Sequence, residues 1–381
     1  VLRVGGPMDD KTMAMLAEDG MDVMMGLGLR VSGKPRRRPD YPSDDAFIAD
    51  YVKAVQAFLT RYGPGGTFFK DHPEVPVRPI RHVEIWNEPN YQYMIPPRRG
   101  VPRKQMEAER EALYAKVLPA AFEAVKKGWP RGTVAGFGAG GSSKGDVRFI
   151  QRVLAKDANV PRNFDVLSTH PYSHSAPPEA DCVRTWGSYS AAKSLAEIRQ
   201  ALGKHKRGDA PVWYTEVGWP VSREDGGRFT MAASRTVPLT FQAAYVCRMY
   251  ALAMRLGVDR VNIMFATDTD NYNGGFFLRD GSWRPSAHAV RHMIALMPRP
   301  KLVGAINDGK DGFYAYRFRP DAAKEDGEVI MAWNVAGPKT VSIPWRRGKA
   351  TIIDVLGREK AAAPVNGKLS VEVGPCPVYL K

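Results

Sequence analysis

Two glutamates that are far apart in the chain each end a short apolar segment. Glu88 lies in VEIWNEPN (83–90), and Glu216 lies in VWYTEVGWP (212–220). Hydrolysis of a glycosidic bond needs such a pair, because one carboxyl group protonates the leaving oxygen while the other faces the anomeric carbon as a nucleophile or holds a water there. Either glutamate alone is typical of a solvated loop residue. Together, in these flanks, they favour glycoside hydrolysis.

The segments around both glutamates resemble two motifs of a known enzyme clan. WNEP (86–89) resembles the acid/base motif of the clan A glycoside hydrolases, and YTEVGW (214–219) resembles their nucleophile motif. The likeness is closest to family 39 and its relatives. It implies a (β/α)8 barrel and a retaining mechanism, in which Glu88 ends strand four as the acid/base and Glu216 ends strand seven as the nucleophile. It also implies a carbohydrate substrate and no metal or organic cofactor.

Four more residues are candidates for the substrate site. Asn87 is expected to bind the sugar hydroxyl beside the anomeric carbon, and a turn residue before Pro89 is the alternative. Arg3 ends the first strand-like run, where the resemblance implies an arginine that pairs with the nucleophile; a surface arginine is the alternative. His170 and Tyr172 follow a later strand, where clan relatives use a His or Tyr to orient the nucleophile and contact the sugar. A structural role for the histidine is the alternative.

Later loops and the interior of one strand add further candidates. Trp219 comes three residues after Glu216 and is expected to stack on a pyranose face, with packing against its own loop as the alternative. Asp268 and Tyr272 follow the last barrel strand and are expected to line the pocket. Glu84 shares one side of its strand with the motif residues but lies deeper. We expect it to be a buried structural carboxylate paired with an arginine.

A glycine-rich segment suggests a different function. GFGAGG (136–141) matches the dinucleotide-binding pattern G-x-G-x-x-G between a strand and a helix. The acidic residue expected about 20 residues further on is not convincingly placed, although Asp157 and Asp165 are near. We therefore disfavour a dinucleotide-dependent oxidoreductase and expect the glycines to permit a tight turn after the strand.

A carbohydrate-binding protein without activity is the other alternative. It would use the same fold to hold a glycan. Binding alone does not need Glu88, Glu216 and Asn87 together, so we favour the enzyme.

The composition is that of an ordinary globular protein, with 44% hydrophobic and 25% charged residues in a chain of 381. No apolar run approaches the ~20 residues of a membrane span. Cys182, Cys247 and Cys376 are too few for a disulfide framework, and the spacing of Cys and His predicts no zinc site. The chain begins at Val1 rather than Met, so we expect a removed leader and a secreted or periplasmic protein. The oligomeric state is not predicted.

The chain is strongly basic, with 55 Lys and Arg against 40 Asp and Glu and a net charge of +15. Such a charge suits nucleic acid, an anionic surface or an acidic substrate, and no nucleic-acid-binding motif supports the first. Two basic runs follow the expected strands Met21–Leu27 and His82–Trp86, which would be strands three and four of a complete barrel, on the face expected to carry both glutamates. The runs contain Lys34, Arg36, Arg37 and Arg38, and Arg98, Arg99, Arg103 and Lys104. An acidic glycan is therefore one hypothesis for the substrate, and merely solvated charges are the alternative.

Short apolar runs alternate with amphipathic stretches, which is typical of a parallel α/β protein. The expected strands are Val1–Val4, Met21–Leu27, His82–Trp86, Thr133–Phe137, Phe164–Thr169, Val212–Thr215 and Val261–Phe265. The expected helices are Asp44–Tyr62, Gln105–Lys127, Asp146–Lys156, Tyr189–Leu202, Ala233–Leu256 and Ser286–Met297. Seven strands are one short of the eight in a closed (β/α)8 TIM barrel. We therefore expect the first βα unit of the barrel to be missing from this chain.

After Pro300 the pattern changes to short strands without helices, which is typical of an antiparallel β-sandwich. The expected strands are Phe313–Arg319, Glu328–Trp333, Thr340–Pro344, Ala350–Asp354, Lys368–Val373 and Val378–Leu380. We therefore predict two domains, a catalytic barrel at residues 1–298 and an accessory β-sandwich at residues 299–381.

Overall fold

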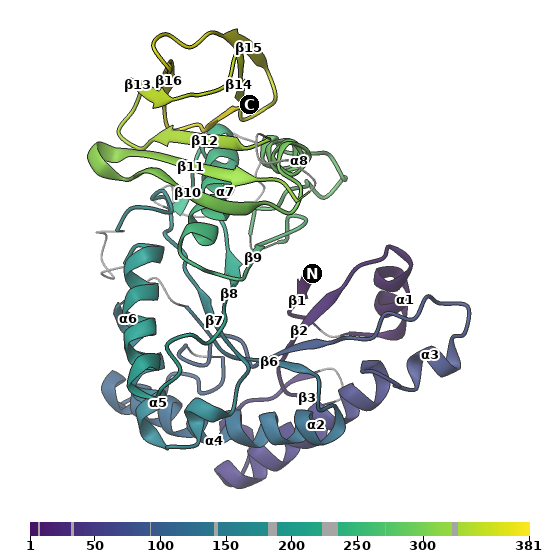
Figure 1. Cartoon of the computed structure of the whole chain (residues 1–381). Coiled ribbons are helices and arrows are strands. Elements are labelled where there is room, and N and C mark those ends of the chain that lie inside the picture. The colour runs from purple at the N-terminus through teal and green to yellow at the C-terminus, as the bar shows by residue number, and fades with distance from the viewer. Residues whose placement is uncertain are drawn as a thin grey trace. The chain divides into compact units, whose positions relative to one another are not determined.

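The computed structural model describes residues 1–6, 8–31, 34–91, 93–140, 144–181, 189–222, 235–270, 272–321 and 327–381 (Figure 1). Cys182, Gly141 and residues 233–234 lie outside the described residues, and the helix expected from Ala233 begins at Leu239. The chain forms two compact units. The first consists of Val1–Pro171 and Val183–Glu216, and the second of Tyr172–Cys182 and Val217–Lys381.

Seven strands form the main sheet, as the sequence predicted, in the order β1-β2-β5-β6-β7-β8-β9. They are β1 (Leu2–Val4), β2 (Val23–Leu27), β5 (His82–Ile85), β6 (Thr133–Gly140), β7 (Val166–His170), β8 (Val212–Val217) and β9 (Arg260–Ile263). The pairings from β1 through β8 are parallel. Every residue of β2, β7 and β8 is buried. Such burial is expected of a parallel sheet, which is covered on both faces. The sheet and its helices confirm the predicted TIM-like architecture.

Helices follow the strands of the first unit, and α2, α4, α5 and α6 contact one another in that order (Figure 1). The helices are α1 (Asp10–Glu18), α2 (Asp44–Tyr62), α3 (Phe68–Asp71), α4 (Arg103–Gly128), α5 (Lys144–Lys156) and α6 (Ala191–Lys204). A small hairpin of β3 (Arg30–Val31) and β4 (Lys34–Pro35) and the short helices η1 (Arg38–Asp40) and η2 (Val160–Arg162) complete the unit. The bounds predicted for α2 are confirmed at both ends. Ser43 caps its first turn by accepting from Ala46 N, and Gly63 follows its last residue.

Two buried tyrosines attach the helices to the ends of the strands. Tyr51 in α2 donates to the carbonyl of Leu27 at 2.7 Å, and Tyr114 in α4 donates to the carbonyl of Ile85 at 2.9 Å. A strand's last carbonyls point beyond the sheet ladder and would otherwise be buried without a partner. These bonds therefore fix where β2 and β5 end.

Gly136, Gly138 and Gly140 of the glycine-rich segment lie inside a strand. The prediction that these glycines form a tight turn after the strand is therefore wrong. β6 runs to Gly140, and its register against β7 shifts between Gly136 and Ala139. Phe137 and Gly138 have φ angles of 85° and 47° there. Ser168 of β7 holds this bulge, since its hydroxyl donates to Gly136 O at 3.0 Å and accepts from Gly138 N at 2.9 Å. The glycines shape a β-bulge, a feature that often lies next to active sites.

The second unit holds the antiparallel sheets that the sequence predicted. A six-stranded sheet has the order β10-β11-β12-β17-β14-β15, and β13 pairs with β16. The strands are β10 (Lys301–Asp308), β11 (Phe313–Arg319), β12 (Val329–Asn334), β13 (Lys339–Pro344), β14 (Ala350–Asp354), β15 (Glu359–Ala362), β16 (Lys368–Val373) and β17 (Val378–Leu380). Only β10 and β15 were not predicted. Gly304 interrupts the first, and the second (EKAA) has no β-branched or aromatic residue.

Both faces of the central strands of the six-stranded sheet, β11, β12, β14 and β17, carry buried residues. Tyr316, Met331 and Trp333 lie in one apolar cluster with α7 (Leu239–Arg255) and α8 (Pro285–Leu296) (Figure 1). Ala315 and Ile330 lie in another cluster with buried residues of β13 and β16. This two-sided packing groups both helices with the C-terminal strands. The domain boundary predicted between residues 298 and 299 stays a prediction. Among the described residues, no helix is both long enough and apolar enough to cross a bilayer.

A buried ion pair ties the segment before residue 182 to this unit. Arg248 in α7 is fully buried, and its Nε donates to Glu179 Oε1 at 2.9 Å while Nη2 contacts the other carboxylate oxygen. Its Nη1 donates to the carbonyl of Pro375 at 3.0 Å. The guanidinium therefore joins α7 to a loop and to the C-terminal segment.

Removal of this guanidinium should destabilise the protein strongly. We expect Arg248→Met to lower the free energy of unfolding by about 3–5 kcal/mol, because it leaves the buried Glu179 carboxylate without its partner. Urea unfolding would measure the loss. Arg255→Met is a matched control from the same helix, since its pair with Asp308 is exposed, and it should change stability by about 1 kcal/mol or less. Equal effects of the two substitutions would contradict the prediction.

Candidate active site

Glu88, His170 and Glu216 meet at the carboxyl ends of the parallel strands, all within the first unit. His170 is the last residue of β7, Glu216 lies next to the end of β8, and Glu88 follows β5 by three residues. His170 Nδ1 is 3.1 Å from Glu88 Oε1 and 3.6 Å from Glu216 Oε2. One carboxylate oxygen of each glutamate and the ring nitrogen all lie within 4.8 Å of one another. The structure thus brings the two predicted glutamates and the predicted histidine together.

The three side chains differ in their access to solvent. The His170 side chain is fully buried, Glu216 is 10% exposed and Glu88 is 14% exposed. Burial fixes the histidine between the carboxylates, whereas Glu88 keeps the largest open surface of the three. A group that exchanges protons with a substrate and with water needs that access.

Arg3 joins the nucleophile candidate to two other polar residues. Its Nη1 contacts Glu216 Oε1, and its Nη2 donates to Asn87 Oδ1 at 2.7 Å. Nε and Nη2 both donate to Glu84 Oε2, at 2.8 and 2.5 Å. The side chain is only 8% exposed. Arg3 therefore lies against Glu216, as the resemblance implied, and Glu84 is the buried, arginine-paired carboxylate that the sequence predicted.

The bulge in β6 makes room for Glu84. A Cβ atom on Gly138 would lie 3.0 Å from Glu84 Cδ and 3.2 Å from its Oε1. Burial alone would raise the pKa of Glu84, but the positive charge of Arg3, with help from His170, more than offsets it and holds the pKa below the ordinary value of 4.5. This lowered pKa favours the charged carboxylate of Glu84 inside the sheet.

The chain that carries Glu88 turns sharply and is held on both sides. Trp86 and Glu88 have φ angles of 67° and 44°, in the left-handed region that few residues other than glycine adopt. Trp86 N donates to Leu27 O at 3.0 Å, and Glu88 N donates to Gly138 O at 2.9 Å. Backbone strain of this kind persists only where the surroundings enforce it, and it gathers at functional sites. The neighbouring strands, and the bulge in particular, set the direction of the Glu88 side chain.

The loop after Glu88 brings a residue to the site that the sequence analysis missed. Arg110 donates to Ile95 O at 3.0 and 2.9 Å, and Tyr91 donates to Asp146 Oδ2 at 3.0 Å. Between these anchors Tyr93 is 46% exposed. Partial burial, followed by the negative charges of Glu88 and Glu216, raises the pKa of Tyr93. An aromatic residue five positions after Glu88 was the available signal for it.

The negative charges of Glu88 and Glu216 both act on His170. Burial alone would lower the pKa of His170, but the negative charges of Glu216 and Glu88 outweigh it and raise the pKa above its ordinary value of 6.5. Imidazole and carboxylate groups at this spacing are also the ligand types of a metal site. The sequence predicted no metal here, and that stays a prediction.

The stability of the protein should depend on pH through His170. A raised pKa means that the proton stabilises the folded state, so this contribution is fully present below pH 6.5 and is lost as the pH rises through the raised value. We expect the difference in unfolding free energy between the wild type and His170→Asn to shrink between about pH 6 and pH 9. Urea unfolding across that range would measure it, and a difference that grows with pH would contradict the prediction.

Trp219 differs from its prediction. The side chain is fully buried in the second unit, and its Nε1 donates to Ala176 O at 3.0 Å and to Ser173 Oγ at 3.2 Å. Its ring packs edge-on against Tyr245. A ring without exposed surface cannot stack on a sugar, so the predicted stacking role is wrong and the packing alternative holds.

Tyr172, Asp268 and Tyr272 also lie in the second unit. Tyr172 is half-buried, and its hydroxyl is 2.7 Å from Met264 Sδ. Both carboxylate oxygens of Asp268 accept hydrogen bonds from Arg284, with Nη2 at 2.7 Å from Oδ2. Oδ1 also accepts from Gly275 N at 3.0 Å. Asp268 therefore braces its own loop, and Tyr272 is buried. Contact of Tyr172 or Asp268 with a sugar stays a prediction.

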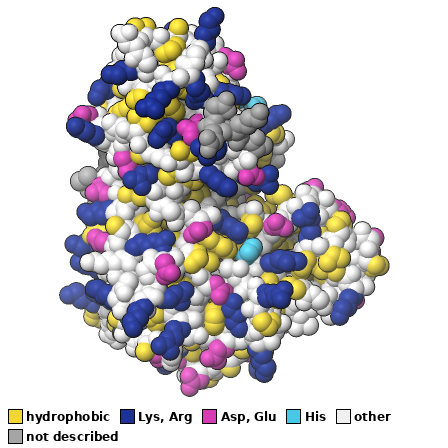
Figure 2. All heavy atoms as spheres, viewed as in Figure 1, with side chains coloured by type: hydrophobic (Ala, Val, Ile, Leu, Met, Phe, Trp, Pro, Cys, Tyr) yellow, Lys and Arg dark blue, Asp and Glu magenta, His cyan; other side chains and the backbone are white. Residues whose placement is uncertain are grey.

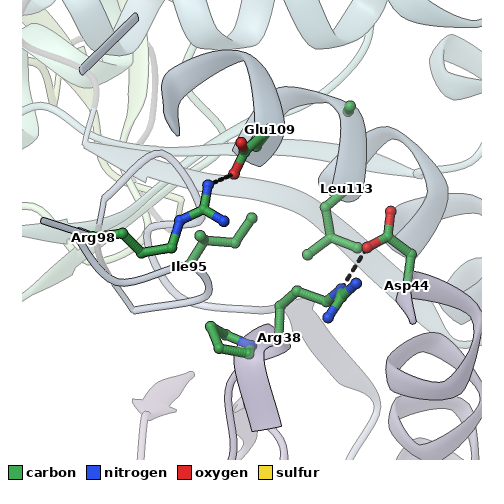
Figure 3. Close-up of a pocket in the computed structure, with 8 residues that line it drawn as sticks. Arg38, Asp44, Ile95, Arg98, Glu109 and Leu113 are labelled. Carbon is green, nitrogen blue, oxygen red and sulfur yellow. Dashed lines mark hydrogen bonds and ion pairs between the residues drawn. The ribbon is translucent and has the colours of Figure 1, made fainter. Parts of the chain in front are cut away.

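The two basic runs meet at a pocket of about 330 Å³ in the first unit (Figure 3). Arg38 pairs with Asp44, and Arg98 pairs with Glu109. These arginines hold helices α2 and α4 rather than offering uncompensated charge. Lys and Arg side chains are spread over the face shown in Figure 2. The acidic-glycan hypothesis thus depends on exposed residues such as Arg36 and Arg37, and it stays a hypothesis.

Solved structures of glycoside hydrolases share this fold. A family 39 glycoside hydrolase from the gut symbiont Bacteroides cellulosilyticus WH2 matches with a TM-score of 0.67 and 20% identity, over 99% of this chain and 74% of that one. A monomeric β-xylosidase from Caulobacter crescentus CB15 matches with a TM-score of 0.55 and 14% identity, over 100% and 95%. A family 51 α-L-arabinofuranosidase from Thermotoga petrophila RKU-1 matches with a TM-score of 0.60 and 13% identity, over 98% and 78%.

No protein-family model matches the chain, and no curated protein matches it. The resemblance to family 39 and clan A that the two motifs indicated is confirmed at the level of the fold. At these identities the likeness concerns the arrangement of helices and strands. The chemistry must be argued from the residues themselves.

Proposed function

We propose that this protein is a retaining glycoside hydrolase that cleaves O-glycosidic bonds of an oligosaccharide or polysaccharide, with Glu216 as nucleophile and Glu88 as acid/base. One observation carries the proposal: carboxylate oxygens from β8 and from the loop after β5 lie within 4.8 Å of each other. Retaining enzymes place their carboxyl groups about 5–5.5 Å apart, and inverting enzymes about 6.5–9.5 Å apart. This close approach of the nearest oxygens supports the retaining geometry, in which Glu216 itself faces the anomeric carbon.

In the first step Glu216 attacks the anomeric carbon. Arg3 contacts its Oε1, so Oε2, the oxygen nearer His170, is the one presented for attack. As the new carbon–oxygen bond forms, the bond to the departing sugar breaks, and Glu88 gives its proton to the leaving oxygen. The sugar is then an ester of Glu216.

In the second step the ester is hydrolysed. Glu88, now a carboxylate, takes a proton from a water that attacks the anomeric carbon, and the ester bond breaks to restore the Glu216 carboxylate. The partial exposure of Glu88 supports this exchange with water. His170 Nδ1 lies 3.1 Å from Glu88 Oε1 and holds that carboxyl group in place through both steps.

Asn87 contributes to substrate binding in this proposal. Arg3 donates to Asn87 Oδ1 at 2.7 Å, which orients the amide so that its NH2 group can donate to a sugar hydroxyl. The bond from Arg3 thus fixes which end of the Asn87 amide faces the substrate. A donor held in a fixed direction is most effective where the substrate gains charge in the transition state. Asn87 is half-buried beside Glu88, which suits a role at the substrate.

The alternatives have less support. Gly136 and Gly138 lie inside β6, where they shape a bulge beside Glu84, and not in the strand-to-helix turn that a dinucleotide pyrophosphate requires. A binding protein without activity would not need strained backbone at Glu88 and a nucleophile clamped by Arg3.

The sugar and the linkage are narrower questions. Solved structures with this fold are named as a β-xylosidase, an α-L-arabinofuranosidase and a glucosidase. These names make neutral pentosides and hexosides the first substrates to test here. A secreted or periplasmic location stays a prediction.

Removal of the nucleophile should abolish turnover, and an external nucleophile should restore it. We expect Glu216→Ala to lower the turnover of dinitrophenyl glycosides below detection, and added azide to restore product as a glycosyl azide of inverted configuration. NMR of the product would give the configuration. A variant with near wild-type activity would rule out Glu216 as the nucleophile.

Removal of the acid/base should act selectively. Glu88→Ala should slow poor leaving groups most, because activated aryl glycosides need little protonation. We expect kcat/KM to fall by about 10²-fold or more for a natural disaccharide and by much less for a dinitrophenyl glycoside. Comparison of kcat/KM along a series of leaving groups would test this. An equal loss along the whole series would contradict the role of Glu88.

A further inference from the structure

We propose that Glu84 is a positioning residue that aims Arg3 at the nucleophile and balances the charge of Arg3 while the glycosyl-enzyme exists. The inference rests on the proposed function and extends it to a residue that does not touch the substrate. Glu84 lies in β5, fully buried, and Arg3, which donates two hydrogen bonds to it, links it to Glu216.

The aim follows from the shape of the guanidinium group. Nε and Nη2 of Arg3 are both bound to Glu84 Oε2, at 2.8 and 2.5 Å. The group is planar and rigid, so once this edge is fixed, the direction of Nη1 is fixed as well. Nη1 is the nitrogen that contacts Glu216 Oε1. Glu84 therefore determines where Arg3 meets the nucleophile.

The charge balance follows from the covalent step. In the free enzyme the buried Arg3 has two carboxylate partners, Glu84 and Glu216. When Glu216 becomes an ester, it loses its negative charge, and of the two carboxylates paired with Arg3 among the described residues Glu84 alone keeps its charge. A buried guanidinium with no carboxylate partner is strongly unfavourable. Glu84 thus removes a penalty that would otherwise appear only in the covalent intermediate.

The fold is shaped to hold this charge. Gly138, at the bulge of β6, has no side chain, and a Cβ there would lie 3.0 Å from Glu84 Cδ. Ser168 stabilises that bulge through hydrogen bonds to Gly136 O and Gly138 N. If Glu84 only filled space in the core, it would need neither the room beside Gly138 nor the pairing with Arg3.

Glu84→Gln tests the inference, because it keeps the size of the side chain and removes its charge. The probe is a dinitrophenyl xyloside with fluorine in place of the 2-hydroxyl, and the corresponding glucoside is the second probe. Inactivation measures formation of the ester, and recovery of activity measures its hydrolysis. We expect the ratio of the two rate constants, inactivation over reactivation, to fall by about tenfold or more, since only the ester state loses its charge balance.

A merely structural role would give a different result. Loss of packing or of aim slows both steps together, since the transition states on either side of the ester need the same geometry. A ratio that falls by less than about threefold would overturn the inference. Glu111→Gln is the matched control, since Glu111 is also a buried glutamate of the first unit, paired with Arg152. It should leave both rate constants unchanged.

Glu84→Asp keeps the inference testable if the Gln variant does not fold. It retains the charge but shortens the reach, so both rate constants should fall by the same factor. Unchanged rate constants, or a changed ratio, would overturn the inference. The outcome is also separable from that of the proposed function. A wild-type protein that forms no adduct on Glu216 with either probe, by mass spectrometry, refutes the proposed function and the inference with it, whereas a wild-type adduct with an unchanged ratio in Glu84→Gln refutes the inference alone.

Discussion

The buried guanidinium of Arg3 is the interaction on which the site depends. It binds Glu84, Glu216 and Asn87 at once while only 8% exposed. A charge buried this deeply must be matched by opposite charge and by hydrogen bonds, or the fold would not tolerate it. Glu84 supplies one partner, and in the proposed mechanism this leaves Glu216 available for chemistry. The proposed nucleophile is then held by a group whose own position does not depend on the state of Glu216.

The sheet provides this arrangement by an irregularity in one strand. A side chain at position 138 of β6 would place its Cβ 3.0 Å from Glu84 Cδ, and the carbonyl of Gly138 accepts from the N–H of Glu88. Both contacts lie at the bulge, which Ser168 on the next strand stabilises. One feature of β6 thus sets the positions of two acidic residues on β5 and its loop. Bulges are used in this way to redirect side chains near active sites.

The second unit also contains a buried guanidinium that is paired with a carboxylate, but this pair has a structural role. Arg248 is fully buried with Glu179 and the carbonyl of Pro375, and it packs over the rings of Tyr245 and Trp333. No chemistry is expected of this pair, because both charges are satisfied by each other and neither faces a candidate substrate group. Arg3 differs, because its guanidinium has one carboxylate more than its charge balance needs, and the additional carboxylate is Glu216, the proposed nucleophile.

The sequence by itself determined most of the helices and strands and indicated the pair of glutamates proposed as catalytic. Strand ends follow from short apolar runs, α2 from its Ser43 cap and Gly63 stop, and Glu88 and Glu216 from their motifs, because these signals are local in the chain. Only the tertiary structure decided the environment of each side chain. Trp219 is buried rather than open to a sugar, the glycines form a bulge rather than a turn, and Arg38 and Arg98 are paired. Burial, register and ion pairing depend on partners that are distant in sequence, and no local pattern encodes which partner a side chain meets.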